Sequence, residues 1–292
     1  MIALTPRHFS AYCQLMRIDR PIGSYLLAWP ALWALWLAAE GPPRLSLLLV
    51  FLCGTFLMRS AGCVINDFAD RQIDGHVARS AQRPLVTAAV SEREALQLFI
   101  LLCSLAASLL LWTNWLTAQL ALVALALTTV YPFCKRFTRL PQLVLGMAFS
   151  FSVPMAFAAQ SGEVPAVAWR LYAAVVTWVV AYDTFYAMVD RDDDIKIGVK
   201  SSAILFGRYD RAITATLQLL FITQMLSIGQ RLSLGPAYTW ALGAAAALLC
   251  YQQWLIAKRD KERCFAAFIN NHRVGMVIFI GLALHYAITA SY

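Results

Sequence analysis

Nine apolar runs, each about 20 residues long, set the strongest limit on how this chain can fold. A helix needs about 20 consecutive apolar residues to cross the hydrocarbon core of a bilayer. The runs lack the short alternation expected of transmembrane barrel strands. We therefore predict an all-α integral membrane protein with nine transmembrane helices, at residues 22–40, 45–66, 94–112, 115–133, 141–160, 168–188, 212–230, 235–257 and 273–290.

Composition supports a membrane location for the chain as a whole. Of its 292 residues, 60% are hydrophobic and only 14% are charged, whereas about 25% of residues are charged in soluble domains. The excess apolar surface must face lipid, so membrane lipid is an expected partner. We predict one transmembrane domain over residues 1–292, in which residues 1–21 form an N-terminal cytoplasmic or interfacial segment. The seven cysteines include no C-x-x-C pair, so they indicate neither zinc nor a disulfide framework.

The basic residues indicate how the chain is oriented. Between the predicted spans, 20 of the 24 Lys and Arg fall on one side of the membrane. The positive-inside rule makes that side cytoplasmic, which places the N-terminus in the cytoplasm and the C-terminus in the periplasm. The net charge of +8 therefore belongs to cytoplasmic loops, and no nucleic-acid partner is expected. Fourteen of the 16 carboxylates lie on the same side, which indicates a polar cap with a function.

Two acidic clusters end spans that are four spans apart, so both emerge on the cytoplasmic side. The first covers residues 66–74 (NDFADRQID), and Asn66, Asp70 and Asp74 share a face if the helix continues. The second covers residues 183–194 (DTFYAMVDRDDD), where Asp183 and Tyr186 begin a stripe. That stripe continues through Asp190 and Asp194 at helical spacing.

Aligned carboxylates repel one another unless a cation compensates them. Mg²⁺ prefers oxygen ligands and usually takes one or two protein carboxylates together with substrate phosphates. Two facing clusters are therefore suited to two or more Mg²⁺ ions around a diphosphate, which the metal stabilises as a leaving group. Six nearby cations are candidates to bind the remaining diphosphate oxygens. They are Arg79, Arg83, Lys135, Arg136, Lys196 and Lys200.

Arg59 lies inside the second span, seven residues before Asn66 and on the same helix face. An arginine at this depth costs roughly 2.5 kcal/mol or more and usually faces a cavity or a partner. One interpretation is a structural pair with Asp183 or with a backbone carbonyl. The other is an anion anchor in a substrate pocket, where the planar guanidinium binds a carboxylate through two hydrogen bonds.

In the two acidic clusters described above, the chain resembles the UbiA-type intramembrane prenyltransferases. The likeness rests on residues 66–74 and 183–194, and it extends from about residue 12 to residue 280. Three flanking segments are similar to the bacterial branch that acts on 4-hydroxybenzoate. They are 16–24 (MRIDRPIGS), 131–136 (YPFCKR) and 192–201 (DDDIKIGVKS).

The resemblance implies nine helices around a central lipid-accessible cavity with a cytoplasmic polar cap, in a bacterial inner membrane. It implies transfer of a polyprenyl chain from polyprenyl diphosphate to carbon 3 of 4-hydroxybenzoate, a step towards ubiquinone. Mg²⁺ is the implied cofactor, and Asp183, Tyr186 and Asp190 are the expected catalytic residues. Arg59 is the expected anchor of the aromatic acid. The expected metal ligands are Asn66, Asp70, Asp74, Asp190, Asp193 and Asp194.

Three alternatives stay open at this stage. Related prenyltransferases act on haem, chlorophyllide or naphthoate acceptors. A CDP-alcohol phosphotransferase also uses a metal and aspartates, but its D-G-x₂-A-R-x₈-G-x₃-D-x₃-D pattern fails after Arg79, where Ala88 and Glu92 replace the required Gly and Asp. A cation transporter would place acids near the midplane of paired broken helices, whereas the acids here crowd at the ends of spans.

Overall fold

The computed structural model describes residues 3–72, 74–76 and 80–290, and this part of the chain contains helices and no strand. The first helices are η1 (Pro6–His8), α1 (Phe9–Leu15), α2 (Ile22–Ala39), α3 (Leu45–Asp70), η2 (Asp74–His76), α4 (Glu92–Leu109), η3 (Leu110–Trp112) and α5 (Trp115–Phe137). They are followed by α6 (Pro141–Ser150), α7 (Ser152–Ser161), α8 (Ala166–Ile197), α9 (Ser202–Phe206), η4 (Gly207–Tyr209), α10 (Asp210–Arg231), α11 (Pro236–Leu255), η5 (Ile256–Lys258) and α12 (Lys261–Thr289).

Nine helical segments within these described residues are long and apolar enough to cross a membrane, which confirms the predicted all-α membrane fold. Seven of the nine contain one long helix each. The fifth consists of α6 and α7, which are separated at Phe151. Pro154 explains the break, because proline has no N–H to donate to the carbonyl of Ser150. The seventh combines α9, η4 and α10.

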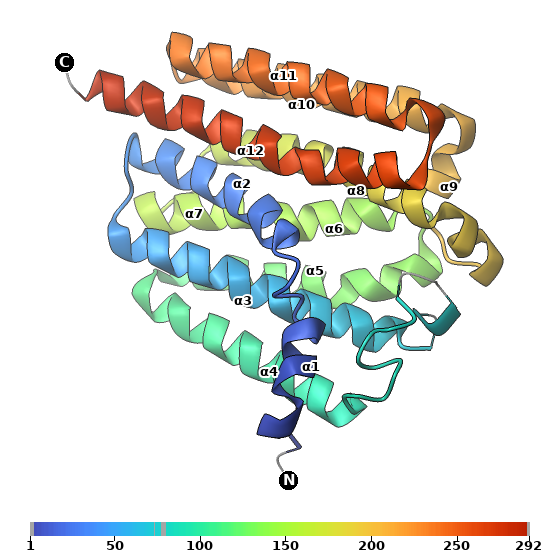
Figure 1. The fold of residues 1–292 in the computed structure, drawn as a ribbon. Helices are drawn as coiled ribbons and strands as arrows, with labels where there is room; N and C mark the ends of the chain where they lie inside the picture. The colour runs from blue at the N-terminus through green and yellow to red at the C-terminus, as the bar shows by residue number, and fades with distance from the viewer. Residues whose placement is uncertain (1–2, 73, 77–79, 291–292) are drawn as a thin grey trace.

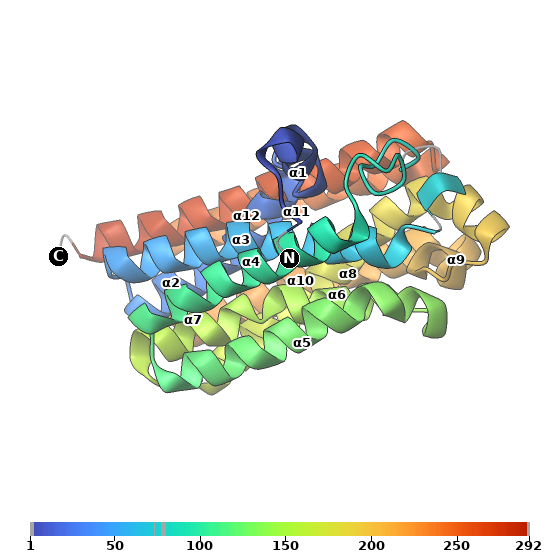
Figure 2. The same cartoon turned by 90° about the horizontal axis from the view of Figure 1, so that it is seen from below.

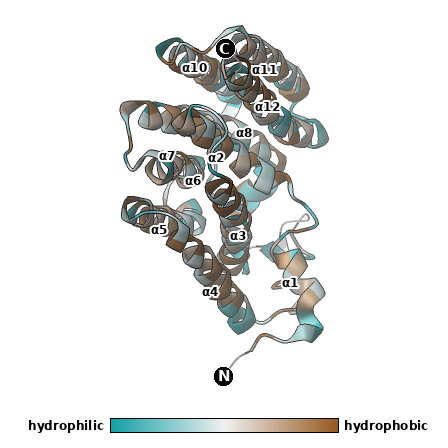
Figure 3. Ribbon diagram, turned by 90° about the vertical axis from the view of Figure 1, so that its left-hand side faces the viewer, coloured by the Kyte–Doolittle hydropathy of each residue, from teal (hydrophilic) through white to brown (hydrophobic). Residues whose placement is uncertain are grey.

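The helices form one layered bundle (Figure 1). α10 and α11 lie at one edge, α4 lies at the opposite edge, and α2, α3, α6, α7 and α8 lie between them. The view from one end shows the same order, with hydrophobic colour predominant along the helices (Figure 3), and the view from below shows α5 at one side of the bundle (Figure 2). α1 lies outside this layering and contacts α3. Its buried Tyr12 and Leu15 join a small apolar cluster with Ala61 and Val64 of α3.

α3 and α8 finish on the same side of the bundle, as the even number of spans between them predicts (Figure 1). We call this side the cap end. Both helices extend beyond the apolar runs, α3 by four residues to Asp70 and α8 by nine residues to Ile197. Asp67 and Asp70 of the first cluster and the four aspartates at 190–194 of the second therefore lie on helical turns that continue past the apolar runs.

The last helix begins at Lys261, twelve residues before the start of the last predicted run. This stretch contains polar residues, and two of them, Asn270 and Asn271, are paired inside the bundle. Asn271 is fully buried and accepts a hydrogen bond from the indole nitrogen of Trp178 at 2.8 Å. The amide of Asn270 accepts one from Gln252 at 3.0 Å. Buried polar groups are tolerated when they are paired in this way.

Candidate functional site

A cavity of about 780 Å³ runs through the half of the bundle formed by α2 to α8. Along α3 its lining extends from Val50 to Asp67, which is about 26 Å of helix at 1.5 Å per residue. The described wall also includes Phe265 and Phe268 from α12. One continuous space therefore joins the cap end to the far half of the bundle.

The two ends of this cavity differ in chemistry. Away from the cap its wall is mostly apolar, with Phe51, Leu110, Leu122, Leu125 and Met155 among the lining residues. Towards the cap, charged and polar side chains from several elements line it. They are Arg17, Arg59, Asn66, Asp67, Arg83, Lys135, Asp183, Asp190, Asp194 and Lys200. The cavity is suited to a ligand with one long apolar part and one anionic part.

The first acidic cluster is partly neutralised by a lysine from α5. Asn66 lines the cavity, and Lys135 Nζ lies 3.2 Å from its Oδ1 atom and 2.7 Å from Asp70 Oδ2. Asp70 is the last residue of α3. The helix does not continue to Asp74, so the shared face proposed for all three residues applies only to Asn66 and Asp70.

Asp74 lies behind this pair, in η2, and does not line the cavity. It is paired with Arg83 at 2.5 Å, and Arg83 also lies 3.0 Å from Asp67. Burial raises the pKa of the Asp74 carboxyl, an effect that Arg83 opposes and that Asp67 and Asp70 reinforce. Arg17, from the N-terminal segment, binds the same oxygen of Asp67, Oδ1, at 2.5 Å.

Local sequence patterns predict no role for Arg17 or Asp67. Asp67 is buried between the two arginines, and this arrangement links the N-terminal segment, α3 and the loop before α4. The backbone of Arg17 adopts the left-handed conformation, with φ of 56°. Such a conformation is uncommon outside glycine, and here it accompanies a side chain that points into the cavity.

The second acidic cluster lies on an unbroken helix, since α8 runs to Ile197. Asp183, Tyr186, Asp190 and Asp194 all line the cavity, so the predicted stripe faces inwards. Asp193 lies outside the lining and is 3.3 Å from the exposed Lys196 in an i, i+3 pair.

The six candidate diphosphate-binding cations divide by location. Arg83, Lys135 and Lys200 line the cavity. Arg136 is exposed outside it and donates to the carbonyl of Ala69 at 2.8 Å. Lys196 is also exposed, and Arg79 lies outside the described residues.

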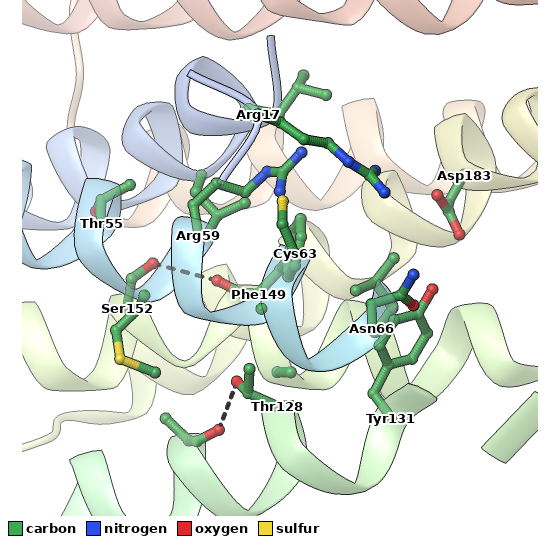
Figure 4. A pocket seen from close by; sticks show the side chains of 18 of the residues that line it. Arg17, Thr55, Arg59, Cys63, Asn66, Thr128, Tyr131, Phe149, Ser152 and Asp183 are labelled. Atoms are coloured by element: carbon green, nitrogen blue, oxygen red, sulfur yellow. Dashed lines mark hydrogen bonds between the residues drawn. The ribbon is translucent and has the colours of Figure 1, made fainter. Parts of the chain in front are cut away.

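Arg59 projects into the cavity, and Arg17 extends into the same region (Figure 4). Among the described residues Arg59 has no ion pair or hydrogen bond, so the structure does not contain the pair with Asp183 that was one interpretation. Its guanidinium lies over Gly23 of α2. A Cβ atom built on Gly23 would be 2.0 Å from Arg59 Nε, so only glycine leaves room for this arginine.

Aromatic rings from α8 and α12 border the cavity beside Asp183. The ring centroids of Tyr186 and Phe268 are 4.9 Å apart, and those of Tyr182 and Phe268 are 5.9 Å apart. Phe265 packs near the same group, 6.1 Å from Phe268. The sequence alone did not distinguish Phe265 and Phe268 from packing or lipid-facing residues.

The donor chemistry of the cap end fits a hard divalent cation. No group of three or more Asp, Glu, His or Cys side chains within the described ranges forms a ready metal site. Mg²⁺ does not need such a group, because substrate phosphates and water complete its shell. Asn66, Asp190 and Asp194 offer oxygen donors to one cavity, and Asp70 lies within reach of the same lysine as Asn66.

Comparison with known proteins gives consistent matches over nearly the whole chain. Residues 27–280 match the profile of the UbiA prenyltransferase family. The 4-hydroxybenzoate octaprenyltransferase of Photobacterium profundum is 57% identical over 284 residues, which cover 97% of this chain and 98% of that protein. The protein of the same name from Aeromonas hydrophila subsp. hydrophila is 57% identical, with 98% and 100% covered.

Solved structures give the same fold. The apo structure of a UbiA homologue from Aeropyrum pernix K1 superposes with a TM-score of 0.79 at 26% identity, covering 92% of this chain and 98% of that one. A UbiA homologue from Archaeoglobus fulgidus, bound to GPP and Mg²⁺, gives a TM-score of 0.73 at 17% identity, with 96% and 99% covered.

Proposed function

Because the chain belongs to the UbiA prenyltransferase family, we propose that it transfers a polyprenyl chain from polyprenyl diphosphate to carbon 3 of 4-hydroxybenzoate. This is a step towards ubiquinone, and the names of the relatives point to an octaprenyl donor. One observation carries the assignment: a single cavity, about 26 Å long where it follows α3, has acidic and basic groups at one end and a mostly apolar wall towards the other. A polyprenyl diphosphate has the same two parts.

Asn66 and Asp70 of α3, with Asp190 and Asp194 of α8, would hold Mg²⁺ at the cap end. The metal, when bound, neutralises the diphosphate and stabilises it as a leaving group. Lys135 must then exchange its contacts with Asn66 and Asp70 for contacts with the diphosphate. The Lys135 ammonium is 3.2 Å from Asn66 Oδ1 and 2.7 Å from Asp70 Oδ2, so it lies beside the position proposed for the diphosphate. Lys200 and Arg83 are the other cavity cations suited to the diphosphate.

Loss of diphosphate leaves an allylic cation, which this chain must protect from water and stabilise. The rings of Tyr182, Tyr186, Phe265 and Phe268 supply aromatic faces on the α8 and α12 side. Asp183 supplies a carboxylate in the same wall, suited to stabilise the cation and to accept the proton released from the acceptor ring. Asp190 lies two turns further along α8, between this region and the cap.

The polyprenyl chain would enter from lipid between α4 and α5. Ala107 of α4 and Leu122 of α5 both line the cavity, and both are exposed, with Leu122 67% accessible. An apolar opening of this kind lets a donor that dissolves only in lipid reach the cap, while the benzoate arrives from water. Asp70, Asp74 and Asp193 do not themselves line the cavity. Asp70 is held beside it by the lining residue Lys135, whereas Asp74 is paired with Arg83 and Asp193 with the exposed Lys196, so Asp74 and Asp193 are proposed only as further ligands.

We expect activity to depend on a divalent cation. Purified protein with octaprenyl diphosphate, 4-hydroxybenzoate and Mg²⁺ should release diphosphate and form the prenylated acid. EDTA should stop both, and excess Mg²⁺ should restore them. Mass spectrometry measures the prenylated acid, and a diphosphate assay measures the diphosphate that is released. Diphosphate release that needs a naphthoate or haem acceptor would reassign the substrate, and uptake without any product would favour the transporter.

The orientation proposed for an inner-membrane enzyme can be tested separately. The loop charges predict a cytoplasmic cap end, an N-terminus inside and a C-terminus in the periplasm. A reporter active only in the periplasm should therefore be active when fused after Tyr292 and inactive when fused before Met1. The reverse pattern would contradict the orientation, although the assignment of the chemistry would stand.

A further inference from the structure

A buried carboxylate outside the cavity, Asp210, joins three segments at the cap end. Its side chain is 0% exposed, and it begins α10. Arg191 of α8 binds its Oδ2 atom. Arg259, in the turn between α11 and α12, approaches with Nε at 3.0 Å from Oδ2 and Nη2 at 2.8 Å from Oδ1. This second contact is the two-bond geometry in which arginine binds carboxylates most strongly.

Further contacts hold the arrangement in place. The backbone N–H of Arg211 donates to Asp210 Oδ1 at 2.6 Å, and Arg259 Nη2 also donates to the carbonyl of Arg208 at 3.1 Å. The backbone of Arg259 is left-handed, with φ of 58°. That conformation is unfavourable for a residue other than glycine, so the surrounding contacts must maintain it.

The helix end that Asp210 contacts carries a concentration of negative charge. α8 is 32 residues long, about 48 Å, whereas the hydrocarbon core is about 30 Å thick. Its last turns carry Asp190, Asp192, Asp193 and Asp194. Carboxylates at a helix C-terminus oppose the helix dipole and repel one another. A contact with the rest of the bundle is therefore needed to hold these turns in place, and Arg191, which lies among the four acids, makes one with Asp210.

We propose that Asp210 is a positioning residue for the reaction: through Arg191 it holds the last turns of α8, so that Asp190 and Asp194 face Asn66 and Asp70 across the cavity. The inference rests on the proposed metal-binding function. It assigns Asp210 no contact with substrate, since Asp210 does not line the cavity. Asp210 would affect the proposed metal site only by fixing the positions of Asp190 and Asp194.

The experiment compares Asp210→Asn with a matched variant, Asp192→Asn. Asp192 is next to Arg191, but it is 67% exposed and its contact with Lys261 is 3.4 Å long. Two measurements do not depend on turnover. The first is amide hydrogen exchange of residues 190–197. The second is Mn²⁺ binding, monitored by electron paramagnetic resonance in the presence of an unreactive prenyl thiodiphosphate.

Asp210→Asn should speed exchange in residues 190–197 and weaken Mn²⁺ binding about 10-fold or more, a range typical of groups that orient metal ligands. The KM for 4-hydroxybenzoate should change less than about 2-fold. Asp192→Asn should match the wild type in all three measurements. Asp210→Glu, which keeps the charge, should recover part of the Mn²⁺ affinity.

Wild-type exchange and Mn²⁺ binding in a folded Asp210→Asn protein would overturn the proposal. If that variant does not fold, Arg191→Gln replaces it, because this change removes the same contact while Asp210 keeps Arg259 as a partner. The same loss of exchange protection and Mn²⁺ affinity is expected, and its absence overturns the proposal. If the wild type itself binds no Mn²⁺ with the analogue, the proposed metal site fails, whereas the exchange comparison still tests the contact with α8.

Discussion

Replacing Asp70 or Asp190 with asparagine should lower turnover about a thousandfold, while the protein stays folded in the membrane. Each change removes an anionic oxygen donor from one side of the proposed metal site. An electrostatic contribution of about 4 kcal/mol to the transition state corresponds to that factor. The loss should appear mainly in kcat, because the diphosphate needs neutralisation most when it departs.

Two details of the structure make this experiment specific. Lys135 keeps a hydrogen-bond partner when Asp70 becomes an amide, since Asn66 Oδ1 lies 3.2 Å from its ammonium. Asp193→Asn is the matched control, because Asp193 lies on the same helix end but outside the cavity lining. Turnover should be measured with saturating Mg²⁺ and both substrates. Near-normal turnover of Asp70→Asn or Asp190→Asn would show that the replaced residue is not a metal ligand. A thousandfold loss of turnover in Asp193→Asn would add Asp193 to the metal ligands.

The sequence predicted the features that depend on local periodicity. The nine spans and the inward stripe of α8 follow from spacing along one helix, and the structure contains both. Periodicity did not predict the end of α3. The spacing of Asn66, Asp70 and Asp74 is helical, but the chain leaves the helix at Asp70 and turns towards Arg83. Pairing with a distant cation, rather than helix propensity, determines where Asp74 lies.

Contacts between distant segments account for what sequence reasoning missed. Arg17 and Asp67 are 50 positions apart, and no local pattern predicts their ion pair. Phe265 and Phe268 lie at the start of α12, where polar neighbours had obscured the helix. The six candidate cations had similar sequence contexts, yet the structure brings only three of them to the cavity within its described residues. Proximity in the sequence to an acidic motif was therefore a poor guide to which cations face the substrate.

Replacing Arg59 with glutamine should raise the KM for 4-hydroxybenzoate about 30-fold and change the KM for the prenyl diphosphate less than about 3-fold. A charge-assisted pair with a carboxylate contributes about 2 kcal/mol, which gives that factor. The acceptor is a carboxylate that must enter a partly dry cavity, where an unpaired charge is very unfavourable. Arg59 lines that cavity with no ion pair among the described residues, so its guanidinium is available to an anion.

Gly23 allows the same assignment to be tested without removing the charge. In Gly23→Ala the new Cβ would lie 2.0 Å from Arg59 Nε, and the flexible end of the arginine must move aside. The KM for 4-hydroxybenzoate should therefore rise about 10-fold in a folded protein, a smaller effect than that of Arg59→Gln. Gly243→Ala is the matched control, because nothing lies within 4 Å of its added Cβ.

If 4-hydroxybenzamide serves the wild type as well as the acid does, no carboxylate anchor exists. If Arg59→Gln weakens only the prenyl diphosphate, Arg59 belongs to the donor site, and the acceptor must bind elsewhere.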